Sequence, residues 1–350
     1  KHGTRLILDP GAKVILESQG SNIRIEGELV VNGNFNFSGL GHFVFAEGNQ
    51  LTFGNNLYTF FLEGQGISQR FVLLEAPVHI NGLHRLLWTD GLVEITYGNL
   101  NFTNGAGADF ERVTFTGGDN AIFGNQASGI NLLSCVLTGI TDPIQGVESV
   151  SLYVNQCQFD SYNIGIYWAN SNFFNVVNST FTGQSLAKAM DLQNVVLAVI
   201  GGDYIAGHSN GAPSGQIDDD YFEGTGQIIP AVAVELNNVD YCFVRNSQIN
   251  SNDVGIRDLN DVAPSSVFLF QGTTFFENAA GVYMKGNATE GLVLADCATF
   301  ARNKYGIRGS DITLMIDALN SSTSPIDEDQ PNAFLRNPIP QGGGANNMYI

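Results

Sequence analysis

Residues 163–183, NIGIYWANSNFFNVVNSTFTG, decide the fold of this chain. Their apolar residues alternate with polar ones, stop at an Asn or Ser, and start again a few residues later. Such alternation is typical of β-strands with one buried face, and the stretch has neither a helical stripe nor an Asn-Gly hairpin turn. The pattern therefore predicts short strands joined by bends.

The core of that stretch, a small residue followed by two apolar residues around one outward position, recurs along the chain. Measured between first residues, the steps are 22, 22, 24, 44, 22, 26 and 25 residues. Self-similarity at a period of this size indicates a repeat architecture. The eight copies begin at Ala121, Pro143, Gly165, Ala189, Ala233, Gly255, Gly281 and Gly306.

The N-terminal third has a shorter rhythm with the same total period. Four-residue alternations run from RLIL (5–8) to QLTF (50–53), separated by turn-forming pairs such as Pro-Gly and Asn-Gly. Strands about 8 residues apart, three to a unit, give the same unit of about 22–25 residues. We expect each strand to pair with the equivalent strand one coil further on.

The sequence thus predicts an all-β fold, a parallel β-helix solenoid with coils of about 22–25 residues. A single coil cannot bury its inward residues, so coils must stack. An antiparallel sandwich, the competing fold, would need hairpin turns between neighbouring strands. The strand texture of residues 4–317 resembles the right-handed parallel β-helix superfamily (pectin-lyase-like). The run GTRLILDPGAKVILESQGSNIRIEGELVVNG resembles β-helical regions of large secreted and cell-surface proteins of Bacteroidota.

Three segments follow from the repeat. We expect short-strand coils over residues 1–112 and further coils over 113–317, with an insertion loop near 207–229 where the step doubles to 44. Over residues 318–350 the rhythm is lost, and four of the ten prolines lie there. This last segment is interpreted as a cap and a linker-like tail, since an open solenoid end would pair with other molecules.

Composition restricts the function classes. A net charge of −19 repels phosphate backbones and argues against a nucleic-acid partner. No apolar run approaches the roughly 18 residues of a membrane span, so we expect no direct membrane insertion. The chain begins at Lys1, which suggests a piece of a larger polypeptide. Cys135 and Cys157 lie one coil apart, and we expect stacked free thiols, with a disulfide as the alternative.

Alternation assigns the residues of each repeat copy to two faces. The residue before the outward position should point inward and form a core stack: Ile122, Ile144, Ile166, Met190, Val234, Ile256, Val282 and Ile307. The outward positions should form a column on the lateral face, with neighbours roughly 4.8 Å apart. This column consists of Phe123, Gln145, Tyr167, Asp191, Glu235, Arg257, Tyr283 and Arg308.

The column suggests a glycan groove. Asp191 and Glu235 are adjacent carboxylates, and Arg257 follows them, so the three are candidate catalytic residues. The insertion leaves beside Asp191 and returns just before Glu235, which adds its own side chains to the same place. The candidate ligand-binding residues are Tyr167, Tyr283, Arg308, His208 and Tyr221. The candidate ligands for Ca²⁺ are Asp191, Glu235, Asp218, Asp219 and Asp220.

The hypothesis for the function is a secreted or cell-surface β-helix domain with a structural, adhesion or glycan-contact role. Its expected partners are a polysaccharide or a cell-surface protein. The alternative is a polysaccharide lyase or glycoside hydrolase that acts in the lateral groove. The resemblance implies that such enzymes carry Ca²⁺-binding acids with a basic residue, or an Asp cluster, and this sequence matches neither motif closely. A plain solvated strand face and a trimeric fibre subunit remain as further alternatives.

Overall fold

The computed structural model describes most of the chain, which forms two compact units, Lys1–Tyr162 and Asn163–Ile350. In the residues that the structure describes, both units are built from strands and tight bends, with one short helix in the second. The described residues are 5–8, 13–16, 22–31, 35–39, 42–53, 59–63, 70–184, 187–210, 219–225, 229–260, 262–270, 272–285, 292–310, 313–317, 333–335 and 348–349.

The strands of the first unit follow one another at short intervals. They are β1 (Arg5–Leu8), β2 (Lys13–Leu16), β3 (Asn22–Ile25), β4 (Glu28–Val31), β5 (Phe35–Gly39), β6 (His42–Phe45), β7 (Gln50–Phe53), β8 (Thr59–Glu63), β9 (Arg70–Leu74), β10 (Val78–Asn81), β11 (Arg85–Ile95), β12 (Leu100–Thr103), β13 (Gly107–Thr116), β14 (Ile122–Asn125), β15 (Gly129–Leu133), β16 (Val136–Thr138), β17 (Ile144–Val147), β18 (Ser151–Asn155) and β19 (Gln158–Asp160).

The second unit continues the same pattern and contains the helix. Its elements are β20 (Ile164–Val177), β21 (Thr180–Thr182), β22 (Lys188–Gly201), β23 (Tyr204–Ala206), α1 (Asp219–Glu223), β24 (Val232–Arg245), β25 (Gln248–Asn250), β26 (Val254–Asp258), β27 (Ser266–Leu269), β28 (Thr274–Phe276), β29 (Ala280–Lys285), β30 (Leu292–Asp296), β31 (Thr299–Ala301), β32 (Tyr305–Ser310), β33 (Thr313–Asp317), β34 (Ala333–Leu335) and β35 (Met348–Tyr349). The described part of the chain has no helix long and apolar enough to cross a membrane.

In the first unit strands pair in parallel with the equivalent strands one coil on. Strands β1, β2 and β3 pair with β4, β5 and β6, which confirms three short strands to a coil. Further along, Val78, Leu100, Ile122 and Ile144 are successive partners, each 22 residues after the last. The unit is therefore a parallel β-solenoid.

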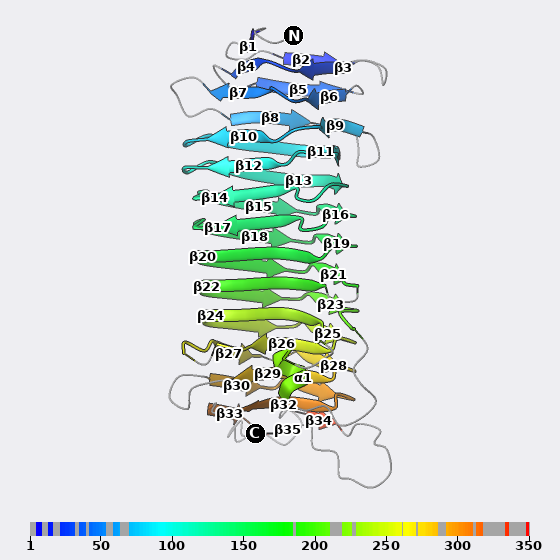
Figure 1. The fold of residues 1–350 in the computed structure, drawn as a ribbon, viewed down its shortest axis with the longest axis vertical. Coiled ribbons are helices and arrows are strands. Elements are labelled where there is room, and N and C mark those ends of the chain that lie inside the picture. Colours follow the sequence, from blue (N-terminus) through cyan, green and yellow to red (C-terminus); the bar gives the residue numbers. More distant parts are fainter. Residues whose placement is uncertain are drawn as a thin grey trace, which may run out of the picture. The chain divides into compact units, whose positions relative to one another are not determined.

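The second unit is a parallel β-solenoid with the predicted register. Figure 1 shows its successive coils as stacked layers of strands. The ladder through β20, β22, β24, β26, β29 and β32 is parallel. Its inward partners are Ile166, Met190, Val234, Ile256, Val282 and Ile307. All six are fully buried, as are Ile122 and Ile144 in the first unit, so the predicted core stack is confirmed.

The coils bend at residues in the left-handed backbone region. Asp90, Arg112, Ser134 and Gln156 form one such series in the first unit, with φ of 56°, 54°, 54° and 56°. Non-glycine residues rarely adopt this conformation, so the stacked ladders on either side must enforce it. The same geometry explains why β20 spans 14 residues: Asn170, with φ of 52°, bends the chain within it.

In two repeat copies the opening glycine is a packing requirement. A Cβ on Gly255 would lie 2.5 Å from the carbonyl oxygen of Gly281, and a Cβ on Gly281 would lie 2.6 Å from that of Gly306. The backbones of neighbouring coils therefore approach closely at this position.

Cys135 and Cys157 lie in neighbouring coils as free thiols. The backbone N–H of Cys135 donates to Sγ of Cys157 at 3.4 Å, and neither cysteine forms a disulfide.

Part of the predicted cap pairs with the solenoid. Strand β34 pairs in parallel with β31, and β35 pairs with β32 through Ile307 and Met348. The other residues of 318–350 lie outside the described residues.

Candidate functional site

The predicted lateral column exists in both units. Phe123 pairs with Gln145 in the first unit. In the second unit the ladder joins Asp191 to Glu235 and Glu235 to Arg257. The complete series of partners there is Tyr167, Asp191, Glu235, Arg257, Tyr283 and Arg308.

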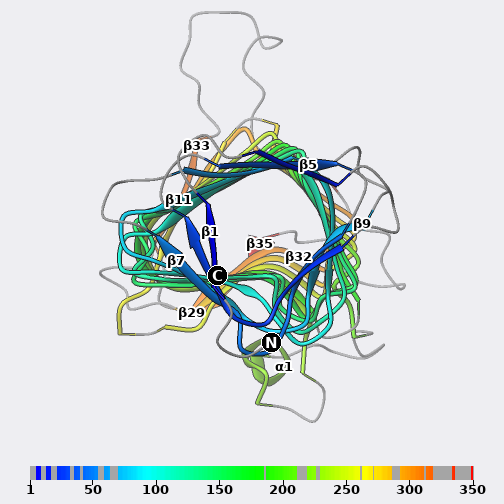
Figure 2. The same cartoon turned by 90° about the horizontal axis from the view of Figure 1, so that it is seen from above.

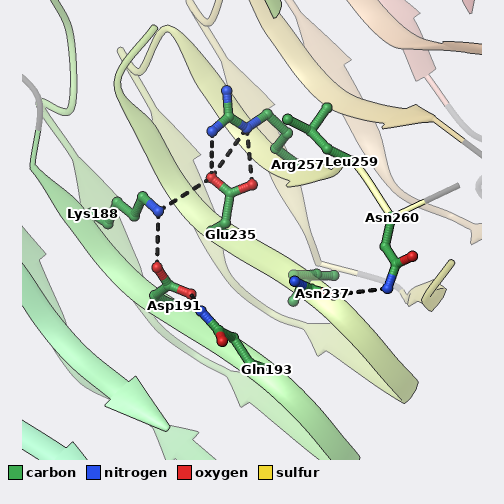
Figure 3. A pocket seen from close by; sticks show the side chains of 9 residues that line it. Lys188, Asp191, Gln193, Glu235, Asn237, Arg257, Leu259 and Asn260 are labelled. Carbon is green, nitrogen blue, oxygen red and sulfur yellow. Dashed lines mark hydrogen bonds and ion pairs between the residues drawn. The ribbon is translucent and has the colours of Figure 1, made fainter. Parts of the chain in front are cut away.

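The centre of the column is a network of ion pairs (Figure 3). Nε of Arg257 donates to Oε1 and Oε2 of Glu235 at 3.0 and 3.1 Å, and Nη2 donates to Oε2 at 2.6 Å. Nζ of Lys188 lies 2.8 Å from Oδ2 of Asp191 and 3.5 Å from Oε2 of Glu235. Two carboxylates are thus matched by two cations, and the network carries no formal net charge.

Lys188 is the member of this network that the sequence-based prediction missed. Lys188 and Asp191 are three residues apart, so strict alternation would place them on opposite faces of the strand. The ladder pairs Ile164 with Lys188 and Ile166 with Met190, but it does not pair the residues between them. This break in the pairing accompanies a loss of strict alternation, and Lys188 reaches the same face as Asp191. The only sequence signal was a basic residue next to the small residue that opens the repeat copy.

A pocket of about 510 Å³ opens over this network. Beside the charged residues its wall carries three amides: Nε2 of Gln193 donates to Oδ1 of Asp191 at 3.2 Å, and Nδ2 of Asn260 donates to Oδ1 of Asn237 at 2.8 Å. The remaining lining comes from Leu236 and Leu259. The wall is therefore dense in hydrogen-bond donors and acceptors, drawn from three successive coils.

Tyr167 adjoins the pocket through Gln193. Its hydroxyl donates to Oε1 of Gln193 at 3.3 Å, and the ring is half-buried. Burial, and then the nearby charge of Asp191, raises the pKa of the Tyr167 phenol. The hydroxyl is accordingly neutral at physiological pH and can both donate and accept a hydrogen bond.

The insertion places α1 over the column beyond Arg257. Nη1 of Arg257 donates to the carbonyl oxygen of Phe222 at 2.9 Å, and the Phe222 ring stacks on Tyr283 with centroids 5.1 Å apart. The Arg308 guanidinium lies 5.3 Å from the Phe222 ring centroid. Seen along the solenoid, α1 lies outside the wall of strands (Figure 2). Tyr283 and Arg308 were predicted to contact a ligand, but both are buried and face α1 instead of solvent.

Glu223 fastens the end of α1. Its Oε1 accepts from the hydroxyl of Tyr283 at 3.3 Å, and its Oε2 lies 3.1 Å from Nζ of Lys285. Tyr221, another predicted ligand-binding residue, is buried in the same cluster, and burial raises the pKa of its phenol. The helix is thus held by apolar packing and by a salt bridge.

Asp253 holds the base of the insertion. This buried carboxylate accepts from the backbone N–H of Asn210 at 2.8 Å and from that of Ala231 at 3.0 Å, so it ties the outgoing and returning ends of the insertion together. His208 is fully buried beside it and bonds Asn252, with Nδ1 2.9 Å from Oδ1. Burial lowers the pKa of His208 to about 4. In this structure His208 supports the coil and does not face the pocket.

The predicted Ca²⁺ ligands do not gather around one point in the described residues. Within that part of the chain, no group of three or more His, Cys, Asp or Glu side chains could hold a metal ion. Asp191 and Glu235 are instead neutralised by Lys188 and Arg257. Asp218 lies outside the described residues, and the same holds for the side chains of Asp219 and Asp220.

The arrangement can therefore bind a polar ligand through many hydrogen bonds at a site with no net charge. Comparison with models of known protein families finds no match, and a search of curated proteins finds no significantly similar chain.

Proposed function

We propose that the protein is an extracellular or cell-surface β-helix domain that contacts a glycan through the lateral pocket. The observation that supports this most directly is the pocket of about 510 Å³ whose polar wall balances its own charges. Ligand pockets of roughly 300–1,000 Å³ with a few convergent polar groups are typical of small-molecule sites. A rigid solenoid suits such a role because coils hold the pocket residues at fixed spacing.

A neutral sugar matches this wall better than a charged ligand. The carboxylate oxygens of Asp191 and the amides of Gln193 and Asn237 offer acceptors and donors side by side, and a hydroxyl group can use both. A charged ligand would have to compete with the existing ion pairs, because each charged side chain of the pocket already pairs with a side chain of opposite charge. Tyr167 adds a half-buried ring at the edge of the pocket, where the apolar face of a sugar ring can pack.

The same contacts weigh against acid–base catalysis, the basis of the alternative lyase or glycosidase. Catalysis of that kind requires a side chain that exchanges a proton with the substrate. Arg257 uses all three guanidinium nitrogens in contacts to Glu235 and Phe222. Lys188 lies between two carboxylates. These groups are arranged to hold the pocket together, which favours binding over turnover.

Calorimetric titration with a panel of neutral oligosaccharides tests the proposal. We expect at least one member to bind, and Gln193→Ala and Asn237→Ala each to weaken binding by roughly five- to tenfold, since each removes about one hydrogen bond. Asn172→Ala, an exposed amide on β20 outside the pocket, is the matched control and should leave binding unchanged.

The same samples test the alternative. If a bound oligosaccharide is cleaved, and cleavage disappears in Asp191→Asn and Glu235→Gln, the enzyme replaces the binding domain as the better function. If no glycan binds, or if the pocket variants bind like the unmodified protein, the glycan-contact role is wrong.

A further inference from the structure

A second pocket lies on another outward face of the second unit. Tyr241, Phe243 and Arg245 alternate along β24 with the buried residues Cys242 and Val244, so the first three point away from the core. The next coil adds aromatic side chains to this face. Phe268 is the ladder partner of Phe243, and their ring centroids are 4.9 Å apart; Phe270 stacks on Phe243 at 5.9 Å. The face is apolar and open, with Tyr241 51% exposed.

The pocket on this face has a volume of about 440 Å³ and is lined by Val199, Phe243, Arg245 and Phe270. It shares no residue with the lateral pocket around Glu235. Its walls are hydrocarbon and aromatic ring, and the Arg245 guanidinium is its one polar side chain. A ligand here meets a large apolar surface and a single positive charge.

Arg245 differs from the other arginines whose side chains the structure describes. Those others pair with a carboxylate or lie over an aromatic ring: Arg5, Arg24, Arg85, Arg112, Arg257, Arg302 and Arg308. Within the described residues, Arg245 has no ion pair, no side-chain hydrogen bond and no ring contact, and its side chain is exposed. Although the chain has a net charge of −19, Arg245 is thus a cation without a carboxylate partner among the described residues, and it lies beside an apolar pocket.

Gly201 lies beside the Arg245 side chain. The two residues are ladder partners on β22 and β24. A Cβ on Gly201 would lie 3.4 Å from Nε of Arg245 and 3.4 Å from a methyl group of Val177, at the short end of ordinary van der Waals contact. The Arg245 side chain therefore lies directly beside the backbone of Gly201. Arg245 can therefore lie across the neighbouring strand at the end of the pocket.

From this geometry we infer that the pocket binds the C-terminal residue of a peptide with a large apolar side chain. The carboxylate pairs with Arg245, whose planar guanidinium suits a two-point contact with a carboxylate. The side chain packs on Phe243 and Phe270, and the rest of the peptide leaves through the open face. A sugar fits poorly because the walls would leave most of its hydroxyl groups without partners. The volume of about 440 Å³ holds one large side chain and its carboxylate.

N-acetylphenylalanine is the probe for this site, followed by chemical-shift perturbation of the intact protein. We expect saturable binding that N-acetylphenylalaninamide lacks, because the amide has the ring without the charge. N-acetylglycine has the charge without the ring and should also fail to bind. Arg245→Gln should weaken binding roughly ten- to hundredfold, the value of a charge-assisted hydrogen bond.

Arg112→Gln is the control, since this exposed arginine pairs with Asp90 in the first unit. Because Arg245 has no ion pair and no side-chain hydrogen bond within the described residues, Arg245→Gln should keep the melting temperature of the unmodified protein. Equal binding of the acid and the amide, or unchanged binding in Arg245→Gln, overturns the inference. Binding of decanoate without N-acetylphenylalanine would assign the pocket to a lipid and likewise overturn it, as would the absence of binding to either probe.

Discussion

Arg257 and Phe222 lie 35 residues apart in the chain, yet Nη1 of Arg257 donates a 2.9 Å hydrogen bond to the carbonyl oxygen of Phe222. The same guanidinium holds Glu235 through Nε and Nη2. One side chain therefore joins the charged network of the lateral pocket to the helix of the insertion. A substitution in the network should therefore also destabilise the helix.

Replacing Arg257 by Met should be strongly destabilising. The pair with Glu235 is nearly buried, with side chains 10% and 11% exposed, and removing one partner of a buried pair costs about 3–5 kcal/mol. Amide exchange in α1 should also rise, because Phe222 loses its donor. The additional change Glu235→Gln should recover part of the loss by removing the unpaired charge. Chemical denaturation and hydrogen exchange measure the two effects.

Arg302→Met is the matched control for this prediction. Arg302 also pairs with a carboxylate one coil away, Glu277, but these side chains are 58% and 46% exposed. Exposed pairs contribute about 0–1 kcal/mol. Equal losses in the two arginine variants would show that the Arg257 network has no special role.

Two neighbouring residues on β22 test the assignment of faces. Val195 is 1% exposed and Val196 is 46% exposed. Val195→Asp should lower the free energy of unfolding by several kcal/mol, because the buried charge has no partner. Val196→Asp should change it by about 0.5 kcal/mol or less. A reversed order would mean that the strand presents its other face to the core.

Asp203 should make stability depend on pH. The carboxylate is buried, accepts the backbone N–H groups of Ser179 and Gly201 at 2.6 and 2.9 Å, and burial raises its pKa to about 8. An unfolded Asp titrates near 3.9, so its contribution is complete below about pH 4 and is lost as pH rises to about 8. The melting temperature of the unmodified protein should therefore fall relative to that of Asp203→Asn across this window.

Taking the difference between the two proteins at each pH removes the contributions of other groups. His208 acts in the opposite sense, since its lowered pKa makes stability rise between about pH 4 and 6.5. Asp203→Asn also loses one backbone contact, which adds an offset that does not vary with pH. A difference that stays constant from pH 4 to 8 would show that Asp203 is ionised throughout the window.

Calcium gives a further test of the lateral pocket. Lys188 and Arg257 already neutralise Asp191 and Glu235, so we expect millimolar Ca²⁺ and chelator to give the same melting temperature. A rise with Ca²⁺ that Asp191→Asn with Glu235→Gln abolishes would show that residues of the insertion, such as Asp218, complete a metal site after all.

The register of the second unit could be predicted from the sequence because the small and apolar residues of each repeat copy recur at nearly constant steps. A step of 22–26 residues returns the chain to the same face, so Ile166 and Met190 had to be partners once the steps were known. The exposure of the column could not be predicted this way. Tyr283 follows the outward pattern, but Phe222 of α1 covers it, and α1 lies in the insertion, outside the repeat. Lys188 was missed because it lies at an odd distance from Asp191, across a break in the pairing.

The place where the insertion departs has a consequence for how the molecule can be altered. Nδ2 of Asn210 donates to the carbonyl oxygen of Ile229 at 3.0 Å, so the chain leaves and returns at nearly one point. Met190 and Val234 pair across the 44-residue step as neighbours do elsewhere. Asp253 thus closes the coil at the base of the insertion, and the ladder continues past it without a change of register. A foreign segment whose ends lie close together can be inserted between residues 210 and 219, which keeps α1 and its contacts to Arg257 and Lys285, so the solenoid can carry an added module there.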